Sequence, residues 1–279
     1  MTTLAQIWSG QPPVCRESDW VTRFHGVTGL PAVPRCPLWG NAPVLNCLVD
    51  PSLGFYFFDD FITQASATSS DYNVYTAVND GATGTNAFQN VAGGIFNLVT
   101  AAADNDYSAL TTTSEIFNLG LSKKVWFEAR IKLAEATTND SAWWVGMTDT
   151  TTTGGFQADA LGPLADYDGC LFWKDEDTLS LSFETSNGAT QNTGSAIASV
   201  VSDTWVRVGF YCDGTATTSV ITPYYEVTGV SGAPMIAGTA KNLTLASMTA
   251  SKLVFGVKAG PGAAAETLQI DYIRALQLR

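Results

Sequence analysis

The ionisable side chains of this chain are too sparsely arranged to build a familiar catalytic centre. The single histidine, His25, lies in a proline-rich segment without a recognisable nucleophile motif, so a Ser-His-Asp or Cys-His mechanism is not expected. Hydrolysis of a glycosidic bond needs two carboxyl groups that flank the bond. The densest acidic run, residues 175–177, falls between two predicted strands, where we expect a solvated hairpin turn. The sequence therefore predicts a protein that is not an enzyme.

Metal ligands are equally sparse. The five cysteines contain no Cys-x-x-Cys pair, and one histidine cannot form a histidine-rich site. We expect mostly reduced cysteines, with a disulfide among Cys15, Cys36 and Cys47 as an open alternative. Two acidic turns, residues 104–106 and 166–169, leave calcium bound by oxygen ligands as an alternative to ordinary Asx turns. We predict no metal site and no cofactor.

Tryptophan is the residue type that most favours binding, because its large face can stack on a sugar ring or fill a docking interface. Adjacent Trp143 and Trp144 must point to opposite faces of their predicted strand, so at least one could lie outside the core. A sandwich buries most of its aromatic residues, so burial is the default, and Trp143, Trp144 and Trp173 are candidate glycan contacts as the alternative. Trp8, Trp20 and Trp39 lie in the proline-rich segment, and we predict that they dock this segment on a surface.

The overall composition limits the partners. The chain of 279 residues is 46% hydrophobic and 14% charged, which is typical of a globular protein. Its 14 basic and 26 acidic residues give a net charge of −12, which disfavours nucleic acid and anionic membrane surfaces as partners. The sequence shows no signal-peptide pattern at its start and no run of 18 apolar residues, so we expect synthesis in the cytoplasm and no membrane span.

Prolines divide the chain into two regions. Seven of the 11 lie in the first 51 residues: Pro12, Pro13, Pro31, Pro34, Pro37, Pro43 and Pro51. Because proline lacks an N–H donor and restricts the preceding residue, we predict an extended or looped arm over residues 1–54. The arm is too apolar for a solvated linker. It either wraps its own domain or docks on a neighbouring subunit, where an extended chain can add to a sheet edge.

Residues 55–279 have the pattern of strands and turns, and we predict no helix there. Between Val125 and Leu133 the apolar residues alternate with polar ones and Trp126, which is the pattern of a half-buried strand. Polar residues 174–178 and the pair Asp213-Gly214 each indicate a hairpin, and Pro223 indicates an edge or bulged strand. Further predicted strands are Ile95 to Thr100, Ala142 to Thr148, Gly169 to Lys174, Thr178 to Thr185, Trp205 to Cys212, Ser219 to Val227, Lys252 to Val257 and Leu268 to Leu276.

Four segments carry a resemblance to a known family. They are Trp126-Phe-Glu-Ala-Arg-Ile-Lys-Leu133, Trp144-Val-Gly-Met-Thr-Asp149, Trp205-Val-Arg-Val-Gly-Phe-Tyr-Cys-Asp-Gly214 and Leu268-Gln-Ile-Asp-Tyr-Ile-Arg274. Their order resembles the concanavalin A-like lectin and glucanase sandwich, in particular its laminin-G-like branch. The resemblance implies an all-β, antiparallel two-sheet jelly roll with residues 57–62 as the first strand beside 268–274. A glucanase of that family would carry a Glu-x-Asp-x-x-Glu strand, and this sequence has none.

The sandwich combined with a Pro- and Trp-rich arm and Thr/Ala/Gly-rich loops also resembles virion structural proteins of tailed bacteriophages. This implies a non-enzymatic capsid decoration (cement) protein or head fibre. Its partners would be the major capsid protein and copies of itself, on the outer capsid surface, after synthesis in the host cytoplasm. The alternative is a carbohydrate-binding module that adheres to host or environmental glycans. A glycosidase is a third hypothesis.

Overall fold

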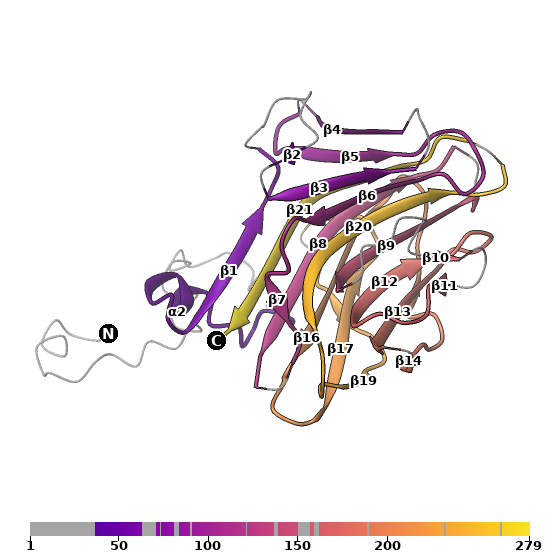
Figure 1. Ribbon diagram of the computed structural model, residues 1–279. Helices are drawn as coiled ribbons and strands as arrows, with labels where there is room; N and C mark the ends of the chain where they lie inside the picture. Colours follow the sequence, from indigo (N-terminus) through magenta and orange to yellow (C-terminus); the bar gives the residue numbers. More distant parts are fainter. Residues whose placement is uncertain are drawn as a thin grey trace, which may run out of the picture.

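The computed structural model describes residues 37–62, 71–72, 74–80, 84–89, 91–120, 122–136, 139–149, 157–158, 162–188, 190–231, 233–262 and 264–279. Two antiparallel sheets lie face to face in these residues and form a sandwich (Figure 1). This confirms the predicted all-β, two-sheet jelly roll.

The first sheet has nine strands in the order β18-β17-β16-β8-β21-β5-β4, with β1 beside β21 and β19 beside β17. Its strands are β1 (Gly54–Asp59), β4 (Thr85–Gln89), β5 (Ile95–Val99), β8 (Val125–Ala134), β16 (Trp205–Cys212), β17 (Thr218–Glu226), β18 (Ile236–Ala237), β19 (Lys241–Thr244) and β21 (Thr267–Leu278). The C-terminal strand β21 therefore lies near the middle of the sheet, between β8 on one side and β1 and β5 on the other.

The second sheet has ten strands in the order β14-β13-β12-β9-β20-β6-β3-β2, with β15 beside β13 and β7 beside β20. Its strands are β2 (Asp71–Tyr72), β3 (Tyr75–Asn79), β6 (Tyr107–Thr112), β7 (Phe117–Asn118), β9 (Ser141–Thr148), β12 (Gly169–Lys174), β13 (Ser180–Asn187), β14 (Thr190–Asn192), β15 (Ala198–Ser199) and β20 (Ala250–Ala259). A small separate pair is formed by β10 (Gln157–Ala158) and β11 (Gly162–Pro163).

Sequence patterns located the long strands well. Strands β12 and β16 have the predicted bounds. The first strand pairs with β21 as expected, but it covers Gly54–Asp59 and not the predicted residues 57–62. Both predicted hairpins are present, and Gly214 in the second has the expected positive φ of 65°. Pro223 of β17 lies opposite Phe210 of β16. On the other side of β17, β19 pairs with residues 218–221 and β18 with residues 224–225, so neither strand needs an N–H from Pro223. The sequence analysis missed β3, β4 and β6, whose polar residues resemble those of loops.

The core lies between the two sheets. Strand β8 shows how it is built, because Val125, Phe127, Ala129 and Ile131 alternate along the strand and all have at most 1% of their surface exposed. Phe127 packs beside Phe210, and Phe210 beside Phe183 of the opposite sheet. The buried, free thiols of Cys170 and Cys212 belong to the same core, in agreement with the expectation of reduced cysteines.

The last part of the predicted arm lies on its own sandwich. Leu38 and Ala42 are buried against Trp126 and Leu276 on the outer face of the nine-stranded sheet. The structure differs from the predicted extended arm in a short helix, α2 (Val44–Val49), which fits in the proline-free run between Pro43 and Pro51. The domain division at residue 54 stays a prediction. In the described part of the chain, no helix is long and apolar enough to span a membrane.

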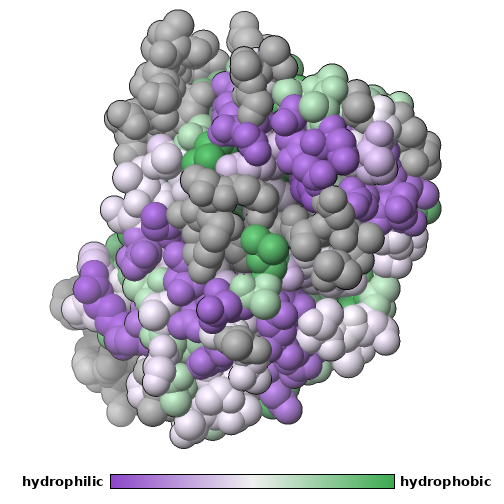
Figure 2. All heavy atoms as spheres, turned by 45° about the vertical axis from the view of Figure 1, so that its right-hand side comes forward, coloured by the Kyte–Doolittle hydropathy of each residue, from purple (hydrophilic) through white to green (hydrophobic). Residues whose placement is uncertain are grey.

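The outer face of the ten-stranded sheet carries a second apolar cluster, formed by Tyr107, Trp144, Tyr167, Leu171 and Val254. Trp144 pairs with Gly256 across β9 and β20, and a Cβ atom at position 256 would lie 2.1 Å from the indole ring. Glycine at position 256 therefore leaves the space that the indole occupies. Outside its grey areas, the face seen in Figure 2 is a mosaic of hydrophilic and weakly hydrophobic residues, with strongly hydrophobic ones in small spots.

We predict that Gly256→Val lowers the free energy of unfolding by about 1–3 kcal/mol, because the new side chain overlaps the indole of Trp144. Urea denaturation followed by tryptophan fluorescence measures the change. In a Trp144→Ala background the same substitution should cost clearly less. An equal cost in both backgrounds would contradict the proposed overlap.

Candidate functional site

The outer face of the nine-stranded sheet brings charged and aromatic side chains together over its central strands. Arg130 of β8 lies opposite Arg207 of β16 on one side and Tyr272 of β21 on the other. Arg207 in turn lies opposite Glu226 of β17. Since residues directly opposite each other in a sheet point to the same face, these four side chains form one row across the outer surface.

This row forms the floor of a pocket of about 200 Å³. Trp205 and Asp271 also line the pocket, and Gly229, Val230 and Ser231 of the loop after β17 form one wall. Asp271 lies at a register shift of β21, where one extra residue interrupts the pairing with β8. Such bulges redirect side chains. Here the bulge brings Asp271 next to Arg130, with which it forms an ion pair.

Ion pairs and an aromatic ring hold both arginines. The guanidinium carbon of Arg130 lies 4.4 Å from the centre of the Trp205 ring, within the range of a cation–π contact. Arg207 Nε lies 3.7 Å from Glu226 Oε2, and Arg207 also donates to the carbonyl oxygen of Ala233. Both arginine side chains are largely but not fully buried, at 27% and 17% exposure. The pocket is therefore preorganised, and polar groups remain accessible in it.

A buried carboxylate, Glu128, separates this pocket from the N-terminal segment. Its Oε2 atom accepts hydrogen bonds from Trp39 Nε1 at 2.6 Å and from Arg274 at 2.7 Å, and its Oε1 accepts one from the Tyr272 hydroxyl at 2.5 Å. The Arg274 guanidinium also lies 4.4 Å from the Trp39 ring centre. Burial and the neighbouring Glu128 carboxylate both raise the pKa of Tyr272, so its hydroxyl remains a donor.

The N-terminal segment can lie this close to the sheet because of Gly209. A Cβ atom at this position would lie 2.5 Å from Leu38 Cδ2 and 2.4 Å from the Phe127 carbonyl oxygen. Gly209 is opposite Glu128 on β8. No side chain therefore projects from the sheet directly beside the carboxylate that binds Trp39. These contacts hold Trp39 on the outer face of the nine-stranded sheet, and its role in docking the arm stays a prediction. Trp8 and Trp20 lie outside the described residues.

The predicted glycan-contact tryptophans are largely covered. Trp143 faces the core at 1% exposure, and Trp144 lies in the outer cluster at 2%. The default of burial thus holds for these two, and we correct their candidate role as glycan contacts, because neither indole has a free face for a sugar ring. Trp173 is half-buried beside Gly162, and its buried Nε1 has no hydrogen-bond partner in the described part of the chain.

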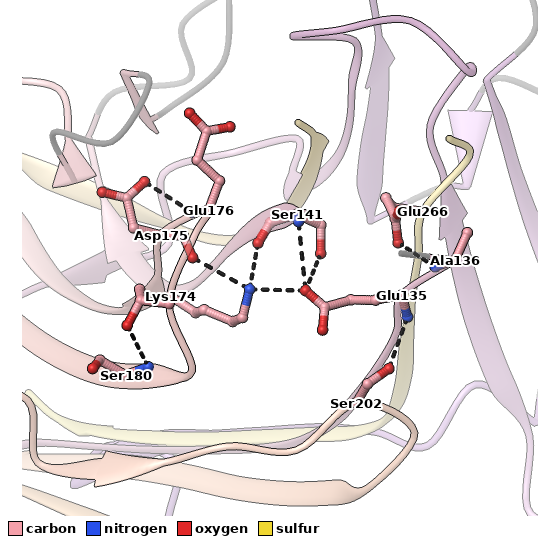
Figure 3. A network of polar contacts seen from close by, with 10 residues as sticks. Glu135, Ala136, Ser141, Lys174, Asp175, Glu176, Ser180, Ser202 and Glu266 are labelled. Carbon is pink, nitrogen blue, oxygen red and sulfur yellow. Dashed lines mark hydrogen bonds and ion pairs between the residues drawn. The ribbon is translucent and has the colours of Figure 1, made fainter. Parts of the chain in front are cut away.

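The acidic run 175–177 is also less exposed than predicted. Asp175 and Glu176 are buried, whereas Asp177 is exposed. Beside them, as Figure 3 shows, the fully buried Lys174 ammonium group donates to Glu135 Oε1, to the Ser141 carbonyl and to the Asp175 carbonyl, at 2.8, 2.6 and 3.2 Å. A buried ammonium is tolerated when its three donors are satisfied. This network ties the ends of β8, β9 and β12 together and is structural.

Of the carboxylates considered as calcium ligands, that of Asp168 has structural partners. Asp168 accepts hydrogen bonds from the backbone of Gly188 and from both donors of Thr249. Asp106 closes a turn through its backbone N–H and the Ala103 carbonyl, with Asn105 at a φ of 66°. Among the residues that the structure describes, no three His, Cys, Asp or Glu side chains converge as metal ligands.

Glu184 is another buried carboxylate with a structural role. It accepts hydrogen bonds from Tyr167 and Gln191 at Oε1 and from Thr193 at Oε2. Burial raises its pKa, although these three hydrogen bonds act in the opposite direction. All the donors come from within its own sheet and loops, so Glu184 holds this edge of the ten-stranded sheet together.

Sequence reasoning missed the pocket itself. It placed Arg130 on the outer side of β8 and quoted the strands that carry Trp205 and Asp271, but it assigned none of them to a site. The alternation along β8 indicated which of its side chains lie on the outer face, where the pocket is. The pairing of β8 with β16 and β21, which assembles the pocket, connects positions more than 70 residues apart.

The sequence matches no protein-family model and no curated protein. Among solved structures, a protein of unknown function from Shewanella oneidensis MR-1 is similar with a TM-score of 0.53 and 14% identity, over 96% of each chain. Peanut lectin is similar with a TM-score of 0.54 and 10% identity, over 81% of this chain and 98% of the lectin. Basic winged bean lectin, solved with Tn-antigen, gives 0.52 and 11%, over 81% and 99%. The chain thus has the concanavalin A-like lectin fold, and at these identities the likeness shows the fold alone.

We predict that Trp39→Phe lowers the free energy of unfolding by about 1.5–3 kcal/mol, because it removes a hydrogen bond to a charged, buried acceptor. Trp173→Phe is the matched control, since the indole N–H of Trp173 has no acceptor in the described residues and its loss should cost less. Urea denaturation compares the two variants. Equal costs would show that the bond from Trp39 to Glu128 does not anchor the segment.

Proposed function

We propose that this protein binds carbohydrate, without catalysing a reaction, in the pocket on the outer face of the nine-stranded sheet. The observation that carries the proposal is the combination of aromatic side chains, Trp205 and Tyr272, with ion-paired arginines and carboxylates in one open pocket. Sugars offer apolar C–H faces and many hydroxyl groups. A site with aromatic surface and fixed donors and acceptors suits both.

The fold supports this proposal without establishing it. Two of the similar structures are legume lectins, and one of them was solved with the Tn-antigen. The absence of a catalytic role is also part of the proposal. Each carboxylate that lines the pocket, Glu226 and Asp271, is paired with an arginine. Glycoside hydrolysis instead needs one carboxyl group as a proton donor and a second as a base or nucleophile.

The test is a glycan array probed with the wild-type protein and with Trp205→Ala. We expect a defined set of glycans to bind and the substitution to weaken binding about tenfold or more, because it removes aromatic surface from the pocket. Val220→Ala, an exposed position on β17 that does not line the pocket, is the control and should bind as the wild type does. Absence of specific binding by the wild type would reject the proposal, and release of sugar products would revive the glycosidase hypothesis.

A second proposal is that the protein decorates the outer surface of a virion, where it binds the major capsid protein and copies of itself. It is supported by exposed apolar side chains on α2 and near β1. Val49 is 78% exposed, Leu48 59%, Phe58 52% and Leu53 49%. Leu48, Val49 and Leu53 lie in the last part of the predicted docking arm, and Phe58 follows it. In the described residues β1 pairs with β21 alone, so one edge of β1 remains open to an added strand.

Immunogold electron microscopy of particles purified from the producing culture tests this second proposal. We expect labelling of the capsid surface. A Leu48→Ser, Val49→Ser double variant should fail to rebind particles stripped of the protein, because it removes apolar surface from the proposed contact. Val220→Ala should rebind normally. Unlabelled particles, or normal rebinding of the double variant, would count against this role for the patch.

A further inference from the structure

The pair Arg130 and Arg207 is the most unusual feature of the pocket. The two residues lie directly opposite each other on β8 and β16, where Cβ atoms are about 4.5–5.5 Å apart. Like charges in such positions destabilise a sheet. The pair therefore has an energetic cost that the fold itself does not require.

The carboxylates of the pocket offset this cost from the two outer sides. Asp271 pairs with Arg130 through Nη1, and Glu226 with Arg207 through Nε. Arg207 Nη2 donates to the carbonyl oxygen of Ala233, and Glu226 also accepts hydrogen bonds from the N–H and hydroxyl of Thr228. These contacts hold the two guanidinium groups in place before any ligand binds, so binding needs little reorganisation of them.

Several N–H donors of the pair stay available. Each guanidinium carries five N–H groups. Among the described residues, no acceptor bonds Nε or Nη2 of Arg130 or Nη1 of Arg207, and none of these atoms is buried without a partner. They therefore retain contact with solvent at the pocket. Such donors prefer a charged, two-oxygen acceptor such as a carboxylate or a sulfate.

Resting on the proposed carbohydrate binding, we propose that the ligand is an acidic saccharide whose carboxylate or sulfate group lies between Arg130 and Arg207. An anion there relieves the repulsion of the pair and accepts its unused donors. The sugar ring then lies against the half-buried Trp205 and Tyr272. Because Asp271 and Glu226 balance the local charge, selectivity rests on directed hydrogen bonds. The net charge of −12 repels nucleic acids and acidic saccharides alike, so recognition must come from the directed contacts in the pocket.

Isothermal titration with matched ligands tests this inference on the full chain. The first pair is an oligogalacturonate and its methyl ester, which differ in charge but share the sugar. The second pair is a sulfated galactan oligosaccharide and its desulfated form. We expect the wild type to bind at least one acidic member about tenfold or more tightly than its neutral counterpart. The single variants Arg130→Lys and Arg207→Lys should lose most of this preference, because lysine keeps the charge but lacks the planar set of donors.

Lys252→Gln, on the opposite sheet, is the charge control and should keep the preference. Circular dichroism and thermal unfolding verify that each variant is folded. Equal affinity for acidic and neutral members would overturn the inference while leaving carbohydrate binding intact, whereas no binding of any saccharide on the array would reject the proposed function itself. A preference that survives both arginine variants, or equally tight binding of single-stranded DNA, would also overturn the inference.

Discussion

The alternation of side chains along β8 is the constraint on which the rest of the structure depends. One set of alternate residues is packed into the core with almost no exposure, which fixes the orientation of the strand. The other set, Trp126, Glu128, Arg130 and Lys132, must then lie on the outer face. Because β8 pairs with β16 and β21 along most of its length, the side chains of three strands are aligned in rows. Both the docking area and the pocket are made from these rows.

The two areas meet at Tyr272. Its ring lines the pocket, whereas its hydroxyl donates to Glu128, the carboxylate that also binds Trp39 of the N-terminal segment. The segment and the pocket thus share a residue although they come from opposite ends of the chain.

The sequence was sufficient for the sandwich and insufficient for the site, for physical reasons. Alternation and turn residues are local properties, and they located β8, β12, β16 and the two hairpins. Burial by a distant segment is not local. Trp144 was correctly placed on the opposite strand face from Trp143, but period-2 reasoning does not reveal that Tyr107 and Tyr167 join Trp144 in a second apolar cluster. Likewise, nothing near Asp175 in the sequence indicates that Gly162 donates to its carboxylate.

The extra residue in β21 has a further consequence. Before it, Leu268 and Ile270 face the core, and after it Ile273 and Ala275 do, so even-numbered positions are replaced by odd-numbered ones. One continuous strand therefore has two patterns of inward-facing residues. The first part pairs with β5 and the second part with β1. A loop can gain or lose a residue with little effect on the core. In β21 the same length change would exchange inside and outside for half of the strand, so the length of this strand is as firmly constrained as the identity of its residues.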